Sequence, residues 1–150
     1  MNFTGPALEL LEQLEGCRLQ AYQDEGGMWT IGYGHTGRDV QPGAAITKDQ
    51  ADEFLRDDLG RFISGAHEAL AITLNDNQFS ALVILAYNIG IDALLHSRLL
   101  GFINAGLIPQ ALAAWYQWCH VRGVASSGLM HRRVKEVLLF NQPTEVTGNA

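Results

Sequence analysis

Apolar side chains near the N-terminus recur at the spacing of one helix face. They occupy positions 7, 8, 10, 11 and 14. Thr4 is suited to cap this helix, Pro6 suits its first turn, and Gly16 is suited to end it in a left-handed turn. The pattern predicts a helix over 7–15. Glu15 then lies in the last turn, where a carboxylate faces the negative end of the helix dipole at a cost of a few tenths to about 1 kcal/mol. This local misfit is a first hint that Glu15 has a function.

The pattern changes between residues 19 and 46. Leu19-Gln20-Ala21-Tyr22 alternates, and Met28-Trp29-Thr30-Ile31-Gly32-Tyr33 is rich in strand formers. Asp24-Glu25-Gly26-Gly27 between them is a turn sequence, and glycine recurs at positions 32, 34, 37 and 43. This texture predicts a small antiparallel hairpin or a three-stranded sheet.

Helical patterns fill the rest of the chain. Thr47-Lys48-Asp49-Gln50 fits a capping box, which predicts a helix over 48–70 with a break near Gly60 or Gly65. A further helix is predicted over 76–88, capped by Asn75 and closed by Gly90, and it is apolar on nearly all sides. Three more helices are predicted over 93–105, 109–118 and 128–140. Pro109 lies in the first turn of the second of these, and Ser127 caps the third. The polar tail 141–150 is predicted to fray.

Strands in one segment and helices in the others indicate the α+β class, here mainly α. We expect a single domain over 1–150. Its parts are a sheet lobe at 16–47, a connecting helix at 48–70, a helical lobe at 75–140 joined by the N-terminal helix, and the tail 141–150. Two such lobes joined by a helix would leave a cleft for a ligand.

Composition narrows the class of protein. The chain has 150 residues, 47% hydrophobic and 17% charged, which excludes a disordered chain. Ten basic and sixteen acidic side chains give a net charge of −6, which argues against nucleic acid as a partner. The charge is unevenly distributed, with −9 in residues 1–92 and +3 in residues 93–150. Either the acidic part is a solvated face, or the basic part meets an anionic partner.

Cysteine and histidine show no metal-site spacing. Cys17 and Cys119 are too far apart for a zinc motif, and each is expected to be a small buried hydrophobe, with a bridge or a redox switch as the alternative. The five histidines are scattered. We therefore expect no metal and no cofactor.

The start of the chain has no basic n-region, and Glu9 and Glu12 interrupt its apolar stretch, so no export signal is recognised. The longest apolar run, 79–91, is shorter than the roughly 18 residues that a membrane-spanning helix needs. We expect a soluble protein made in the cytoplasm, without stable membrane insertion. A target outside the cell would require something else to move the protein there.

Glu15, Asp24 and Thr30 form the candidate chemistry. A helix end and a hairpin can bring these side chains around one point. Glycoside hydrolysis needs two carboxyl groups in unlike environments, one protonated to donate to the leaving oxygen and one ionised to orient a water or stabilise the cation. A hydroxyl such as that of Thr30 can hold the attacking water. Spacing alone is weak evidence for this chemistry.

The surrounding sequence resembles the active-site signature of phage-type lysozymes, the endolysins of glycoside hydrolase family 24. Glu-x8-Asp-x5-Thr is embedded in Glu15-Gly-Cys-Arg-Leu and in Thr30-Ile-Gly-Tyr-Gly-His. The resemblance continues through Ala86-Tyr-Asn-Ile-Gly, Ser97-Arg-Leu-Leu and Gly128-Leu-x-x-Arg-Arg, and it covers about residues 8–140. It implies a lysozyme-like fold.

The resemblance also implies an activity. The enzyme would be a muramidase that cleaves the β-1,4 bond from N-acetylmuramic acid to N-acetylglucosamine. Glu15 would be the general acid, Asp24 would assist the water or stabilise the cation, and Thr30 would position the water. Inversion is the implied outcome, which needs carboxyl groups about 6.5–9.5 Å apart, against about 5–5.5 Å for retention. The partner would be bacterial cell-wall peptidoglycan, reached by a monomer from the infected cell's cytoplasm after membrane permeabilisation.

Other residues are candidates for binding the glycan. They are Tyr33, His35, Tyr87 and Asn88. A structural hydrogen-bonding role is the favoured alternative for His35, and core packing is an alternative for Tyr87. Arg18 either binds glycan or supports the helix–sheet junction, for example by pairing with Glu15. The basic residues Arg122, Arg132, Arg133 and Lys135 either meet anionic wall polymers or stem-peptide carboxylates, or form a solvated helix face.

Three alternatives to an endolysin stay open. A lytic transglycosylase would form an anhydro end without water, but retention of Asp24 and Thr30 argues against it. A non-catalytic wall-binding module usually loses a catalytic residue. An antibacterial toxin would use the same chemistry. The sequence does not reveal the host or its wall chemistry, nor whether a protein partner regulates the activity.

Overall fold

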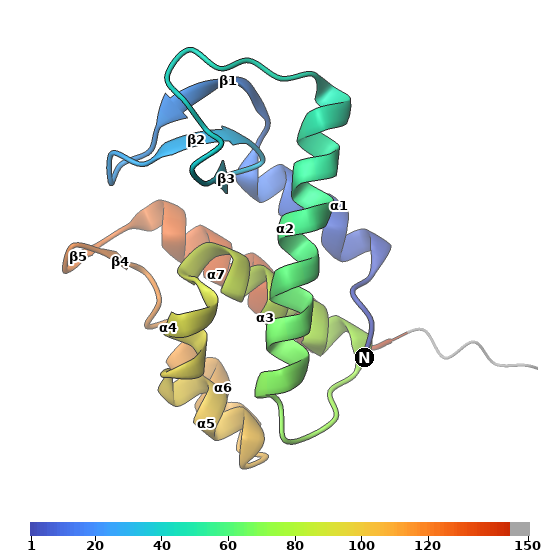
Figure 1. The fold of residues 1–150 in the computed structure, drawn as a ribbon. Helices are drawn as coiled ribbons and strands as arrows, with labels where there is room; N and C mark the ends of the chain where they lie inside the picture. The colour runs from blue at the N-terminus through green and yellow to red at the C-terminus, as the bar shows by residue number, and fades with distance from the viewer. Residues whose placement is uncertain (145–150) are drawn as a thin grey trace, which may run out of the picture. The chain divides into compact units, whose positions relative to one another are not determined.

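The computed structural model describes residues 1–144 and has the α+β architecture that the sequence predicts (Figure 1). Its elements are α1 (Gly5–Glu15), β1 (Arg18–Gln23), β2 (Trp29–Gly32), β3 (His35–Thr36), α2 (Lys48–Ala69), α3 (Asp76–Ile89), α4 (Ile91–Leu95), α5 (Arg98–Asn104), α6 (Ile108–Trp115), β4 (His120–Val121), β5 (Val124–Ala125) and α7 (Ser127–Asn141). Contacts divide the chain into two compact units. We name residues 8–61 the sheet unit, and residues 1–7 with those from Phe62 onward the helical unit. The expectation of a single domain over 1–150 stays a prediction.

Local capping fixes the first helix as predicted. Thr4 Oγ1 accepts a hydrogen bond from the Ala7 N–H at 3.2 Å, which satisfies one of the free amides of the first turn. At the other end, Gly16 has φ +64° and its N–H donates to the Glu12 carbonyl at 2.9 Å. The helix therefore ends on Glu15.

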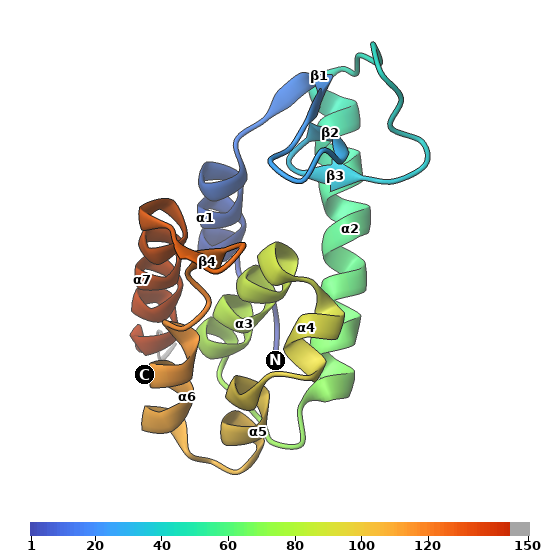
Figure 2. The same cartoon turned by 90° about the vertical axis from the view of Figure 1, so that its left-hand side faces the viewer.

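The sheet is the three-stranded alternative, with antiparallel order β1-β2-β3. Tyr22 pairs with Thr30, whereas Arg18 pairs with Gly32, so the register of β1 shifts between these two pairs. The first half of α2 lies alongside the sheet within the sheet unit (Figures 1 and 2). The side chains of Ile31 and Tyr33 are buried there, 2% and 5% exposed, and form the core that holds the strands.

Helix α2 corrects one prediction, because it runs without a break from Lys48 to Ala69. Its capping box is present: Thr47 Oγ1 accepts from the Gln50 N–H at 3.2 Å and Gln50 Oε1 accepts from the Thr47 N–H at 2.9 Å. Gly65 serves close packing and does not interrupt the helix. A Cβ at this position would lie 2.7 Å from Ile91 Cδ1 and 2.8 Å from Ile91 Cγ1.

Helix α3 forms the centre of the helical unit. Every residue from Phe79 to Ala86 is buried, as the nearly uniform apolar sequence predicts. Asn75 and Gln78 form a reciprocal capping box at its start, and the Gly90 N–H closes its end on the Ala86 carbonyl at 2.8 Å. Helix α7 packs on α3, and α6 contacts both α5 and α7 (Figure 2).

The prediction of one continuous helix over 93–105 is wrong, because the structure has two helices there. The structure has α4 and α5 in its place, separated at His96 and Ser97. Ser97 is the N-cap of α5, because its Oγ accepts from the Leu100 N–H at 3.1 Å. A serine inside an apolar periodic segment was the signal for this break.

The end of the chain brings further corrections. Helix α6 stops at Trp115 and not at residue 118, and the hairpin β4–β5 that follows was not predicted. The N-cap of α7 is Ser126, one residue earlier than predicted. The predicted tail begins at residue 141, which is the last residue of α7, and its residues 145–150 lie outside the described residues. Within residues 1–144, no helix combines the length and the apolar character needed to cross a membrane.

Candidate active site

The three predicted catalytic residues all belong to the sheet unit. Glu15 is the last residue of α1 and is half-buried, Asp24 directly follows β1, and Thr30 lies in β2. The chain reaches Asp24 through β1 and returns to Thr30 through the turn 24–28. Each side chain is therefore held on or next to a regular element, which limits its motion.

The carboxylate of Asp24 is fixed by its own turn. Its Oδ1 accepts hydrogen bonds from the Gly26 N–H at 2.9 Å and from the Met28 N–H at 2.8 Å. This is an Asx-type turn, in which the side chain takes the place of a backbone carbonyl. Asp24 is exposed, and within residues 1–144 its Oδ2 has no hydrogen-bond partner. One oxygen thus orients the group and the other is available to a water molecule.

Thr30 is the most deeply buried of the three, with 3% of its surface exposed. It lies in the central strand, opposite Tyr22 on β1 and Thr36 on β3. Its hydroxyl donates to the Met28 carbonyl at 3.0 Å. Because a hydroxyl has a single proton, Thr30 Oγ1 can act toward any further partner only as an acceptor.

Tyr22 lies on β1, opposite Thr30 and two residues before Asp24, and the sequence did not point to it as part of the site. Burial raises the pKa of the Tyr22 hydroxyl, the guanidinium of Arg18 opposes that shift, and the negative charges of Glu15 and Asp24 add to it. Both carboxylates therefore lie close enough to act on one phenol. The available signal was spacing along a strand, since Tyr22 and Asp24 are two residues apart and strand side chains alternate between faces.

Arg18 supports this arrangement from the side of Tyr22. Its guanidinium carbon lies 4.3 Å from the centre of the Tyr22 ring, a cation–π geometry. This contact lies within β1, so whether Arg18 binds glycan or supports the helix–sheet junction stays a prediction. The partner that we find for Arg18 is the aromatic ring.

Two of the predicted glycan-binding residues lie in the sheet unit but are occupied by internal contacts. The Tyr33 ring is buried, with the Lys48 ammonium 5.0 Å from its centre. His35 Nδ1 lies 2.7 Å from Asp58 Oδ2, and His35 Nε2 lies 2.9 Å from Asp39 Oδ2. The ring also stacks on Phe54 with centroids 4.3 Å apart. This is the structural role that we favoured for His35, and its contact with glycan stays a prediction.

The other two predicted glycan-binding residues lie at the end of α3, in the helical unit. The half-buried Tyr87 ring packs against Phe62, with centroids 5.1 Å apart. Asn88 is exposed, and its Oδ1 accepts a hydrogen bond from Arg133 Nη2 at 2.7 Å. Core packing and glycan contact thus remain compatible for Tyr87, while Asn88 is exposed and held in one orientation.

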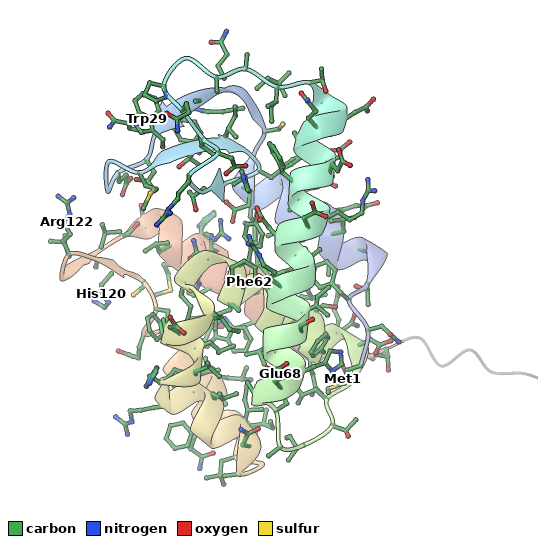
Figure 3. The ribbon with its side chains drawn as sticks, in the orientation of Figure 1. Met1, Trp29, Phe62, Glu68, His120 and Arg122 are labelled. Carbon is green, nitrogen blue, oxygen red and sulfur yellow. The ribbon has the colours of Figure 1, made fainter. Side chains whose placement is uncertain are left out.

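Arg133 corrects the expectation of an exposed basic helix face. Both Arg133 and Glu136 are fully buried, and burial raises the pKa of Glu136 to about 7, against the opposing charge of Arg133. Arg133 is therefore not available to an anionic polymer. Arg122 and Lys135 are exposed, and Figure 3 shows Arg122 at the tip of the hairpin β4–β5.

The cysteines differ from each other. Cys119 is buried, as expected, whereas Cys17 is exposed at the start of the sheet, which corrects its prediction. Both are free thiols. No group of three or more histidine, cysteine, aspartate or glutamate side chains in residues 1–144 could hold a metal ion.

A small antiparallel sheet within one unit and a mainly helical second unit are the architecture of the lysozyme class of folds. The phage lysozyme family matches residues 12–136, so the chain belongs to that family. It is 40% identical over 146 residues to an endolysin of Bacillus phage PZA, covering 96% of this chain and 57% of the relative. It is 34% identical over 144 residues to an endolysin of Salmonella phage P22, covering 93% of this chain and 98% of the relative.

Solved structures show the same fold. The muramidase domain of SpmX from Asticaccaulis excentricus superposes with a TM-score of 0.87 at 36% identity, covering 95% of this chain and 99% of that domain. The similarity confirms the predicted fold class and the resemblance to phage-type lysozymes. The chain spans little more than half the length of the two Bacillus phage endolysins that it matches, 57% and 54%.

Proposed function

We propose that the protein is an endolysin that hydrolyses peptidoglycan, cleaving the β-1,4 bond between N-acetylmuramic acid and N-acetylglucosamine as a member of glycoside hydrolase family 24. The observation that carries the proposal is the placement of Glu15, Asp24 and Thr30 in one compact unit, at the end of α1, directly after β1 and in β2, with the Asp24 carboxylate fixed by its own turn. Family membership and endolysin relatives support it.

Glu15 is the proposed general acid. It donates its proton to the glycosidic oxygen as the bond to the anomeric carbon breaks. Its position at the end of α1 is costly for a negative charge, because the helix carbonyls face it.

Asp24 and Thr30 are the proposed water-handling pair. The Thr30 proton is already donated to the Met28 carbonyl at 3.0 Å, so Oγ1 can only accept a hydrogen bond from the water. Asp24 is held through Oδ1, so Oδ2 can accept the other water proton. A water that donates both protons to these two acceptors presents a lone pair to the anomeric carbon. In the proposed mechanism this water attacks the anomeric carbon directly, with inversion.

The test begins with turbidity loss of purified cell walls. We expect Glu15→Gln to abolish lysis, because an amide has no proton to donate. Glu9→Gln is the matched control, since Glu9 is exposed on the same helix α1 and should leave lysis unchanged. Equal lysis by the wild-type protein and Glu15→Gln would contradict the assignment.

Product analysis of defined peptidoglycan separates the reaction classes. Hydrolysis gives reducing muramic acid ends, with the α-anomer formed first if the reaction inverts. Anhydro-muramyl ends would indicate a lytic transglycosylase, and wall binding without new ends would indicate a non-catalytic module. We expect the protein to act as a monomer on the wall, after the host membrane has been permeabilised.

A further inference from the structure

The amide of Asn88 has a fixed polarity. Its neighbour is the guanidinium of Arg133, whose Nη2 lies 2.7 Å from Asn88 Oδ1. A guanidinium has only donors, so the amide atom that faces it must be the oxygen. The Asn88 NH2 group then points the other way. Asn88 is exposed, and within residues 1–144 its NH2 group has no acceptor.

The guanidinium that fixes this polarity is itself held by several partners. Arg133 Nε lies 2.9 Å from Glu136 Oε1, and Nη2 donates to Glu136 Oε2 at 3.0 Å. Its Nη1 donates to the Trp118 carbonyl at 3.2 Å. Glu136 in turn accepts from Trp115 Nε1 at 3.1 Å. These contacts leave the guanidinium little freedom to turn, so the Asn88 oxygen cannot exchange places with its nitrogen without losing a hydrogen bond.

The burial of this network requires an explanation beyond stability. Arg133, Glu136 and Trp115 are all 0% exposed. Desolvating an ion pair is expensive, and apolar residues of the same volume often give equal or greater stability. The network does yield one result that apolar residues cannot give, which is an exposed amide held with its donor outward.

We infer that the Asn88 NH2 group donates a hydrogen bond to an amide carbonyl oxygen of the peptidoglycan, with Arg133 as its positioning residue. The inference rests on the proposed function. A group that can only donate favours a carbonyl acceptor. Peptidoglycan offers such carbonyls in the N-acetyl groups of its sugars and in its stem peptide.

Asn88→Asp is the decisive variant, because it keeps the shape of the side chain and the oxygen that Arg133 needs but removes the outward donor. Asn88→Ala removes both. If Asn88 donates to substrate, both variants raise KM by about tenfold with kcat nearly unchanged, the effect of one hydrogen bond lost to an unpaired acceptor. Only Asn88→Ala lowers the melting temperature, because it alone leaves Arg133 without its partner.

A purely structural role gives a different pattern. Asn88→Ala would then lose stability while Asn88→Asp kept wild-type KM and melting temperature, and this result would overturn the inference. Active wild-type protein with an inactive Glu15→Gln variant shows, in the same assay, that the proposed function holds independently. If the wild-type protein gave no new reducing ends, the proposed function would fail first.

The source of the carbonyl is resolved by two substrates. Glycan strands freed of peptide by an amidase keep the N-acetyl groups, and chemically de-N-acetylated peptidoglycan keeps the peptide. A defect of Asn88→Asp that persists on peptide-free strands assigns the acceptor to an N-acetyl group. A defect that persists only on de-N-acetylated wall assigns it to the stem peptide. A KM ratio of one on both substrates and on intact wall contradicts the inference.

Discussion

His35 makes the stability of the protein depend on pH in a defined direction. Burial lowers the pKa of His35, but the hydrogen bonds to Asp39 and Asp58 and their negative charges outweigh burial, so the pKa is raised above its ordinary value. A raised folded-state pKa means that the folded protein binds this proton more tightly than the unfolded chain does. The stabilisation is fully present below the unfolded pKa of about 6.5. It is lost as pH rises through the folded-state pKa.

The magnitude follows from the exposure of the two carboxylates. The Asp58 side chain is 8% exposed, so its hydrogen bond to the protonated ring at 2.7 Å falls in the class worth about 1.5–3 kcal/mol. The Asp39 side chain is 56% exposed, so solvent screens it and its pair contributes about 0–1 kcal/mol. We expect His35→Gln to reduce the free energy of unfolding by about 2–3 kcal/mol at low pH and by about 1 kcal/mol or less at high pH.

Urea unfolding followed by tryptophan fluorescence measures this difference from about pH 5 to about pH 9. Subtracting the variant from the wild-type protein at each pH cancels the titration of all groups that do not interact with His35, which leaves the titration of His35 coupled to Asp39 and Asp58. Double-mutant cycles with Asp58→Asn and with Asp39→Asn divide the effect, and we expect the larger coupling with Asp58. A wild-type minus variant difference that stays constant across this range would refute the reasoning.

Other predictions concern packing, backbone conformation, water positioning and electrostatics. Gly65→Ala should lower the free energy of unfolding by about 1–2 kcal/mol, although alanine has the better helix propensity, because the added Cβ would meet Ile91. Thermal unfolding measures this loss of stability, which should be smaller in an Ile91→Ala background. Arg122 has φ +51°, a left-handed conformation that asparagine adopts more readily than arginine, so Arg122→Asn should raise the free energy of unfolding by about 0.5 kcal/mol. An unchanged or lower melting temperature would contradict this prediction. Thr30→Val should reduce kcat by about 10²-fold with little change in melting temperature, whereas wild-type kcat would refute its role with the water. Wall lysis should weaken as salt rises beyond about 0.1 M, because charges more than about 10 Å apart are then screened and the basic residues of 93–150 attract an anionic wall less strongly. Lysis that does not depend on salt would show that the uneven charge distribution serves solubility and not wall binding.

Elements that depend on neighbouring residues could be predicted from the sequence. The caps at Thr4, Thr47 and Asn75 each bond to an amide three residues away, so their signal lies within one turn of chain. The break before Ser97 shows where such reasoning is weaker. The apolar periodicity on both sides of Ser97 predicted one helix, while the serine cap divides it.

The candidate site divides in the same way. Glu15, Asp24 and Thr30 could be proposed from the sequence because their motif is local and specific, and the turn that fixes Asp24 lies within four residues of it. Tyr22 was missed, because its relation to the two carboxylates depends on how β1 is oriented against the end of α1.

The sequence by itself determined the α+β class, the capped helices and the three catalytic candidates, because short-range hydrogen bonds and motif spacing carry that information. Only the tertiary structure decided the burial and the partners of the ionisable side chains His35 and Arg133. His35 meets Asp58 across 23 positions, and Arg133 meets Asn88 across 45. Sequence gives the charge of such residues, but their burial and partners depend on packing between distant segments. For this reason Arg133, expected on an exposed face, is instead the buried group that orients Asn88.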